Sequence, residues 1–238
     1  MRPALPLLAG AALLIGGCHL FGRDQASGPH ATRDYPVGAF TGIAVAGAYE
    51  VEVRTGSAPS VHAEGGQNRL DKMAVRVDGD TLHIEPVKSM HLSWRDDDKV
   101  KLVVTVPMLA AADIAGSGDV RVDHVAGPAF KGSIAGSGNL RLDRVETASL
   151  DLDIAGSGDI TAAGKSESVK YDITGSGDID AERLIAQTAA VSITGSGGVH
   201  AHATGTASVE VMGSGDVIVT GGAKCTVAKT GSGDIRCS

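Results

Sequence analysis

The side chains best suited to chemistry in this sequence follow a recurring Gly-Ser-Gly tripeptide. The tripeptide occurs at 116–118, 136–138, 156–158, 175–177, 195–197, 213–215 and 231–233. The residue after each copy is Asp119, Asn139, Asp159, Asp178, Gly198, Asp216 and Asp234, in chain order. If the copies stack, their carboxylates lie roughly 5 Å apart and repel one another, so donors or a cation must offset the charge.

Calcium is the weaker of two explanations for this acidic column. The cation prefers about six to eight oxygen ligands, and calcium-binding repeat rolls have a period of about nine residues, half of the period here. We therefore expect each carboxylate to accept hydrogen bonds from its own turn. The residues that remain as calcium candidates are Asp119, Asp159, Asp178, Asp216 and Asp234.

The other groups of polar residues in the sequence do not predict a catalytic or metal site. His200 and His202 share one strand face, but no carboxylate or thiol stands at a spacing that completes a zinc site, so we expect a solvated face. The sequence has no Gly-x-Ser-x-Gly nucleophile elbow. The outward residues next to the corners show no concentration of acids and bases; they are Arg121, Arg141, Thr161, Asp180, His200, Ile218 and Arg236. We predict no enzyme activity and no cofactor.

Two cysteines flank the last Gly-Ser-Gly copy. Cys225 and Cys237 both fall on positions that the alternation directs inward, on the two strands beside that corner. An even pair favours a disulfide if the chain is exported to an oxidising compartment, as the N-terminal residues described next predict. Two free buried thiols remain the alternative, and the absence of Cys-x-x-Cys argues against a redox role.

The N-terminus has the pattern of an export signal. Arg2 precedes an apolar run from Ala4 to Ile15, and Ile15-Gly16-Gly17-Cys18 resembles a lipobox. We expect a signal peptide over residues 1–17, then lipidated Cys18 and a flexible polar tether over 18–35. An ordinary signal peptide with a chance cysteine is the alternative. By resemblance to proteobacterial lipoproteins, His19 in place of Asp favours the outer membrane, with the body facing the periplasm or the cell surface.

The elements around the corners are short strands. Apolar residues alternate with polar ones on both sides of each corner, as in Leu150, Leu152 and Ile154, which indicates half-buried strands. One unit of about 18–20 residues cannot bury its apolar face alone, whereas stacked units can. The fold predicted is all-β, a single-stranded right-handed parallel β-helix over residues 36–238.

Within this β-helix, residues 113–238 form regular coils and residues 36–112 form irregular coils that start and cap the stack. An Asp-Gly pair at 78–79 between alternating strands predicts a hairpin. The corners need glycine because the chain turns sharply and because neighbouring corners stack closely. The structural turn residues are Gly116, Gly118, Gly136, Gly138, Gly156, Gly158, Gly175, Gly177, Gly195, Gly197, Gly213, Gly215, Gly231 and Gly233.

Composition limits the kinds of partner. The net charge of −7 argues against nucleic acid, since phosphate binding needs a basic face. Apolar residues make up 42% of the chain but aromatic residues only 3%, which suits a narrow aliphatic core. After the N-terminal run, no segment reaches the roughly 18–20 apolar residues that span a bilayer.

The repeats resemble the putative auto-transporter adhesin head GIN domain family. The residues that carry the resemblance are Phe40-x-x-Ile43-x-Val45-x-Gly47, Gly79-Asp80-Thr81-Leu82-x-Ile84 and the Gly-Ser-Gly-Asp copies, over about residues 36–238. The resemblance implies a right-handed β-helix with the tripeptides at tight turns, and an adhesion role. The chain departs from the pattern at Gly198, where the acidic residue is missing.

Three functions remain open at this point. The first is a non-enzymatic envelope lipoprotein that acts as an adhesin-like interaction module with an unknown protein or polysaccharide ligand. The second is a carbohydrate-active enzyme or polysaccharide-binding protein of the pectin-lyase-like class. The third is a periplasmic scaffold, a homo-oligomer stacked through the last coil.

Overall fold

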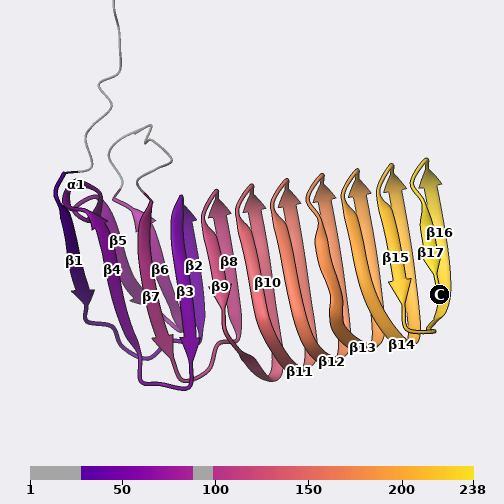
Figure 1. Cartoon of the computed structure of the whole chain (residues 1–238), viewed down its shortest axis with the longest axis horizontal. Helices are drawn as coiled ribbons and strands as arrows, with labels where there is room; N and C mark the ends of the chain where they lie inside the picture. Colours follow the sequence, from indigo (N-terminus) through magenta and orange to yellow (C-terminus); the bar gives the residue numbers. More distant parts are fainter. Residues whose placement is uncertain (1–27, 88–98) are drawn as a thin grey trace, which may run out of the picture.

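The computed structural model describes residues 28–87 and 99–238, and nearly all of its regular structure is β-strand. The strands line up side by side as one long row (Figure 1). The regular part runs over β8 Ala111–Gly116, β9 Asp119–Val122, β10 Val125–Gly136, β11 Asn139–Gly156, β12 Asp159–Gly175, β13 Ile179–Gly195, β14 Gly198–Gly213, β15 Asp216–Thr220, β16 Lys224–Gly231 and β17 Ile235–Cys237.

Successive coils pair in parallel and stay in register at their corners, with shifts of register elsewhere in β11, β12 and β13. Gly136 of β10 pairs with Gly156 of β11, which pairs with Gly175 of β12, and the same column continues to Gly195 and Gly213. Each coil therefore places its Gly-Ser-Gly corner directly against the corner before it. The predicted β-solenoid is confirmed, and its corners line one edge of the row (Figure 1).

The core is a narrow column of aliphatic side chains along the axis. Strand positions that alternate in the sequence alternate between buried and exposed in the structure, so each coil stacks its inward residues on those of its neighbours. One such inward column contains Ile114, Ile134, Ile154, Ile173, Ile193 and Val211, each at most 2% exposed. Stacking of coils thus buries a hydrophobic surface that a single coil cannot cover.

Among the described residues, Tyr171 is the largest fully buried side chain. It stands in register with Leu152 and Val191, so its ring lies in an aliphatic column. Its hydroxyl has no hydrogen-bond partner in the described part of the chain. Burial raises the pKa of the Tyr171 hydroxyl far above its usual value, and the group stays neutral.

Both glycines of a corner permit close stacking of the coils, and the first also permits the sharp turn. Gly156 has φ +139°, a left-handed conformation that other residues adopt only with strain. Gly158 is not among the residues with positive φ, but a methyl there would lie 2.9 Å from Cγ2 of Ile134 and even nearer to the carbonyl oxygen of Gly138. A methyl on Gly156 would also clash with the carbonyl oxygen of Gly136, so the first glycine permits both the turn and the close stacking, and the second permits the stacking alone.

The N-terminal half has the strands β1 His30–Tyr35, β2 Gly42–Gly47, β3 Tyr49–Thr55, β4 Ser60–Gly66, β5 Met73–Asp78, β6 Thr81–Pro86 and β7 Val100–Val106, with helix α1 Gln67–Leu70 between β4 and β5. β2 and β3 form a coil that stacks on β8 and β9. Gly47 pairs with Gly116, so the column of corners begins one coil earlier than the repeats suggest.

The order of coils along the row differs from the order along the chain. β6 pairs with β2, and β7 pairs with β3, on the sides away from β8 and β9. The coil made of β6 and β7 therefore lies outside the coil that precedes it in sequence (Figure 1). The end is closed by antiparallel strands, since β5 pairs with β6, β4 with β7 and β1 with β4. The predicted hairpin at Gly79 joins β5 to β6.

The predicted tether over residues 18–35 is wrong for its last residues. His30–Tyr35 forms β1, and its register runs from His30 opposite Gly66 to Tyr35 opposite Val61. The polar composition of this segment misled the prediction, because an edge strand buries only one face and needs few apolar residues. The folded body thus begins before residue 36. No helix in residues 28–87 and 99–238 is long and apolar enough to cross a bilayer.

Candidate functional site

The acidic column at the corners forms a ladder of carboxylate to backbone hydrogen bonds. Oδ1 of Asp159 accepts from the N–H of Asp178 at 3.0 Å, and Oδ1 of Asp178 accepts from the N–H of Gly198 at 2.6 Å. Asp216 accepts in the same way from the N–H of Asp234 at 2.7 Å. The expectation that each carboxylate serves its own turn is therefore wrong: Asp159, Asp178 and Asp216 serve the turn of the next coil.

The first step of the ladder is made by side chains. Asp119 accepts from Nζ of Lys99 at 2.8 Å and from Nδ2 of Asn139 at 2.7 Å. Burial raises the pKa of Asp119, but the hydrogen bonds from Lys99 and Asn139 outweigh it and leave the pKa below the usual value. The ladder breaks at Gly198, because glycine has no side-chain carboxylate to accept a hydrogen bond from the N–H of Asp216.

These hydrogen bonds explain how the stacked charges are tolerated, since N–H donors face the carboxylates from the neighbouring coil. The described residues contain no group of three or more His, Cys, Asp or Glu side chains arranged to hold a metal. His200 is exposed, and Nδ1 of His202 lies 3.1 Å from the hydroxyl of Thr220. The ladder is best explained as a structural device of the corners.

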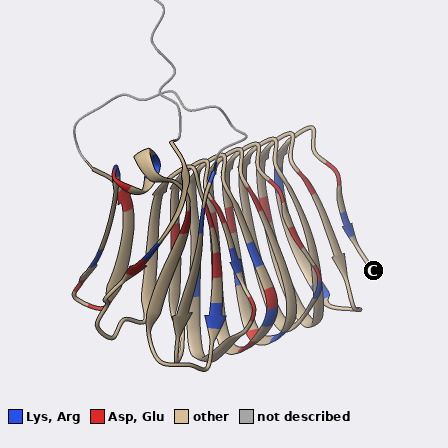
Figure 2. Ribbon diagram, turned by 60° about the vertical axis from the view of Figure 1, so that its left-hand side comes forward, with Lys and Arg blue, Asp and Glu red and all other residues tan. Residues whose placement is uncertain are grey.

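The outward charges of neighbouring coils pair with one another. Oδ2 of Asp143 accepts from Nε of Arg121 at 2.6 Å, and its Oδ1 accepts from Nε of Arg141 at 2.7 Å. Burial raises the pKa of Asp143, but the hydrogen bonds and charges of the two arginines lower it by more. The pKa of Asp143 is therefore below its usual value. Lys131 pairs with Asp153 at 3.1 Å. Figure 2 shows acidic and basic segments interleaved along the coils, so the charges largely neutralise locally.

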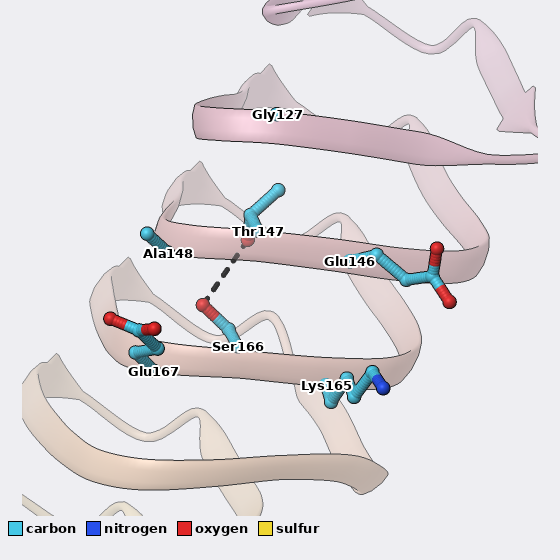
Figure 3. A pocket seen from close by; sticks show the side chains of 7 residues that line it. All are labelled: Gly127, Glu146, Thr147, Ala148, Lys165, Ser166 and Glu167. Carbon is cyan, nitrogen blue, oxygen red and sulfur yellow. Dashed lines mark hydrogen bonds between the residues drawn. The ribbon is translucent and has the colours of Figure 1, made fainter.

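The sequence analysis missed a polar hollow on the side of the stack. It has a volume of about 450 Å³ and is open to solvent; its lining consists of Gly127, Glu146, Thr147, Ala148, Lys165, Ser166 and Glu167. Thr147 and Ser166 are the buried polar residues of the described chain, each 7% exposed. Their hydroxyls are hydrogen bonded at 3.1 Å, and Glu146 and Lys165 lie towards one end of the hollow (Figure 3).

The register of the coils creates this hollow. Gly127, Thr147 and Ser166 occupy one column, in which the next coil has Ala186. A glycine at the top of the column leaves space over Thr147. The signal in the sequence was the break in aliphatic alternation at Thr147 and Ser166, which the repeat pattern concealed.

Glu146 is an ionised carboxylate in this hollow. It accepts from Nη2 of Arg144 at 2.7 Å and lies 3.2 Å from Nε2 of His124. These two neighbours hold the pKa of Glu146 below its usual value. A general acid for glycoside cleavage needs a raised pKa, so the electrostatics of Glu146 do not suit that role.

The structure joins Cys225 of β16 and Cys237 of β17 by a disulfide, with Cα atoms 6.5 Å apart. The two residues stand in register with Ala207 and Val219 of the preceding coil. The fourteen corner glycines all lie at the stacked corners. Cys18, by contrast, lies outside the described residues, as does the signal segment 1–17.

Comparison with known proteins gives the family. The family described as putative auto-transporter adhesin, head GIN domain, matches residues 39–223, most of the solenoid. The chain belongs to this family. No curated protein matches the chain.

Solved structures share the fold of this head GIN domain. A putative adhesin from Bacteroides fragilis is 24% identical, with a TM-score of 0.83, and the match covers 88% of this chain and 97% of that one. A putative lipid binding protein from Parabacteroides distasonis is 24% identical with a TM-score of 0.70, over 89% and 97% of the two chains. A putative adhesin from Parabacteroides merdae is 19% identical with a TM-score of 0.71, over 89% and 97%. These likenesses establish the fold.

Proposed function

We propose that the chain is an exported, lipid-anchored and non-enzymatic interaction module of the bacterial envelope, with an adhesin-like role. The observation that carries the proposal is the match of the adhesin head domain family to nearly the whole solenoid, residues 39–223. The lipobox-like Ile15-Gly16-Gly17-Cys18 supplies the anchor. The body would then project from the membrane as a stiff rod.

Binding fits the surface of the solenoid better than catalysis does. The corner serines belong to turns that pack against the neighbouring corner, as shown by the N–H of Ser157, which donates to the carbonyl of Gly136 at 2.9 Å. The outward carboxylate Asp143 is held by two arginines. In the hollow, the lowered pKa of Glu146 opposes proton donation. Asp143 and Glu146 thus form ion pairs with neighbouring arginines, which suits stabilisation of the coils better than proton transfer.

Lipidation and display are tested together in cells. Full chain and a Cys18→Ala variant are expressed in a bacterium with an outer membrane, and metabolic labelling with palmitate should mark only the former. Protease added to intact cells should remove the solenoid from the surface. Protection of the solenoid in intact cells, with cleavage after the outer membrane is opened, would count against adhesion and favour a periplasmic role.

Adhesion itself needs a gain-of-function assay. Cells that display the chain should attach to immobilised proteins or polysaccharides more strongly than cells that carry Cys18→Ala. A Gly38→Ala variant serves as a control, since nothing lies within 4 Å of that position and the fold should be unchanged. Equal attachment of cells with and without the displayed chain across protein and polysaccharide surfaces would refute the proposal.

A further inference from the structure

The two ends of the solenoid are finished differently. Antiparallel strands and a short helix close the end at β5, β4 and β1. At the other end, β16 pairs only with β14, and β17 only with β15, within the described chain. The last coil stands at the end of the row in Figure 1. The far edges of β16 and β17 therefore present backbone donors and acceptors that a further strand would pair with.

The interior of the stack is also open at this coil. Val227 faces inward in register with Val209, yet it is 48% exposed, whereas Val209 is 1% exposed. Ile235 and Cys225 are only partly buried against the core. An edge strand over an open aliphatic interior is the arrangement that promotes association of solenoids end to end.

In this coil, Lys229 occupies an inward position that is aliphatic in the preceding coils. The inward column that contains Ile173, Ile193 and Val211 continues to Lys229, which pairs with Val211 in the ladder. Nζ of Lys229 donates to the carbonyl oxygen of Gly233 at 2.7 Å, and Lys229 is exposed because no further coil covers this end in the described chain. A charged group thus occupies the place that a buried Ile or Val holds in the coils before it.

The disulfide blocks a second part of the same opening. Cys225 and Cys237 take inward positions in register with Ala207 and Val219, and their bond joins β16 to β17. The bond fixes the two strands of the last coil relative to each other. A further coil would have to pack its aliphatic side chains on the disulfide and on Lys229.

We propose that Lys229, together with the Cys225–Cys237 disulfide, ends the stack and prevents a second copy of this chain from pairing with the last coil. Two copies that met face to face at this end would bring their Lys229 ammonium groups into one apolar interior. Burial of a charge without a counter-ion is strongly unfavourable, and inward-facing charges are a known means of protecting sheet edges. The inference is independent of adhesion, and it rests on the residues of this coil.

The test replaces Lys229 by the residue type of the coil before it. The full chain with Lys229→Val is compared with wild type and with Lys224→Val in detergent micelles by analytical ultracentrifugation. Lys224 lies on the same strand and is exposed on the outer side, so its substitution makes the same change in net charge. We expect one chain per micelle for wild type and Lys224→Val, and a doubling of the protein mass, or more, for Lys229→Val.

Two further variants keep the test decisive. Lys229→Gln retains an N–H donor for Gly233 but removes the charge, so it should also associate if Lys229→Val folds poorly. Val227→Lys added to Lys229→Val restores an inward charge at the neighbouring inward position and should return the protein to one chain per micelle. A folded Lys229→Val or Lys229→Gln that stays at one chain per micelle would overturn the proposal, as would a wild type that doubles its mass.

Discussion

Gly158→Ala isolates the cost of separating two stacked corners. Gly158 has no positive φ, so an alanine there suffers no left-handed strain, and the change adds one methyl group. That methyl would lie 2.9 Å from Cγ2 of Ile134 and 3.2 Å from the carbonyl carbon of Gly138, whereas carbon atoms ordinarily approach to about 3.5–4.0 Å. The oxygen of the Gly138 carbonyl is nearer still, so the two coils must separate locally.

The magnitude follows from what the separation disrupts. The N–H groups of Ser157 and Gly158 donate to the carbonyl of Gly136 at 2.9 and 3.1 Å, and each such bond contributes about 1 kcal/mol net. Overpacking adds about 1–3 kcal/mol. Loss of both bonds with overpacking lowers the free energy of unfolding by about 3–5 kcal/mol.

The measurement is urea unfolding of the full chain, followed by circular dichroism of the β-sheet signal. Two control variants separate the contributions. Gly38 has neither positive φ nor any atom within 4 Å of an added Cβ, so Gly38→Ala should change stability by less than about 0.5 kcal/mol. Gly222 has φ +78° and open space, so Gly222→Ala should cost about 1–2 kcal/mol from backbone strain alone.

The reasoning is refuted if Gly158→Ala unfolds at the same urea concentration as Gly38→Ala. It is also refuted if Gly158→Ala costs no more than Gly222→Ala, because close stacking would then matter less than the backbone conformation. A stack of coils is held together by contacts between neighbours, so a substitution in the middle should also broaden the unfolding transition.

Three further predictions follow from individual groups. The Asp143 carboxyl has a lowered pKa in the folded chain. The stability that it contributes is therefore present above its unfolded pKa of about 3.9 and is lost as pH falls through the folded pKa. Asp143→Asn should weaken this loss of stability in acid, measured by unfolding curves at pH values from neutral to strongly acidic. Tyr171→Phe removes a buried hydroxyl without a described partner and should raise the free energy of unfolding by about 1 kcal/mol, while a loss would show that the hydroxyl is satisfied. Reduction of Cys225–Cys237 frees a segment with a sequence separation of 12 and should cost the last coil about 3 kcal/mol, visible as faster hydrogen exchange in residues 224–238 but not in β11.

The regular half of the fold was predictable because its sequence repeats the same physical requirement in every coil. The spacing of Gly-Ser-Gly fixed the length of a coil, and the alternation around Leu150 and Leu152 fixed which side faces the axis. A shift of register by one residue would turn every aliphatic residue outward. Sequence and register therefore agree at the corners from β8 to β17, whereas the shifts of register within β11, β12 and β13 were not predicted.

The N-terminal half was predictable as strands and one hairpin, but not in the order of its coils. The strands β2, β3 and β7 follow from alternation, but nothing local shows that β6 and β7 stack outside β2 and β3. That order depends on which face of the first coil remains open once β8 and β9 have paired. The antiparallel edge strand β1 was missed because its His, Thr, Arg and Asp side chains are those of a polar segment.

The same limit applies to the sites. The acidic column was visible in the sequence, but its hydrogen bonds join Asp159 to the coil of Asp178, so the donors were 19 residues away from the acceptor. The hollow at Thr147 and Ser166 depends on register between coils and on the missing side chain of Gly127. The local sequence shows whether a side chain faces inward or outward. Its hydrogen-bond partner in the next coil depends on the number of residues in the turn between the two coils.

These constraints determine where recognition can evolve on such a chain. Inward positions and corners are fixed by packing, so the free positions are the outward columns, whose members stand roughly 5 Å apart along the axis. In the described coils many outward charges are already paired, as Asp143 is with Arg121 and Arg141. A partner that binds this surface would gain affinity from many short contacts along several coils, and a straight, stiff stack presents such contacts in a fixed row.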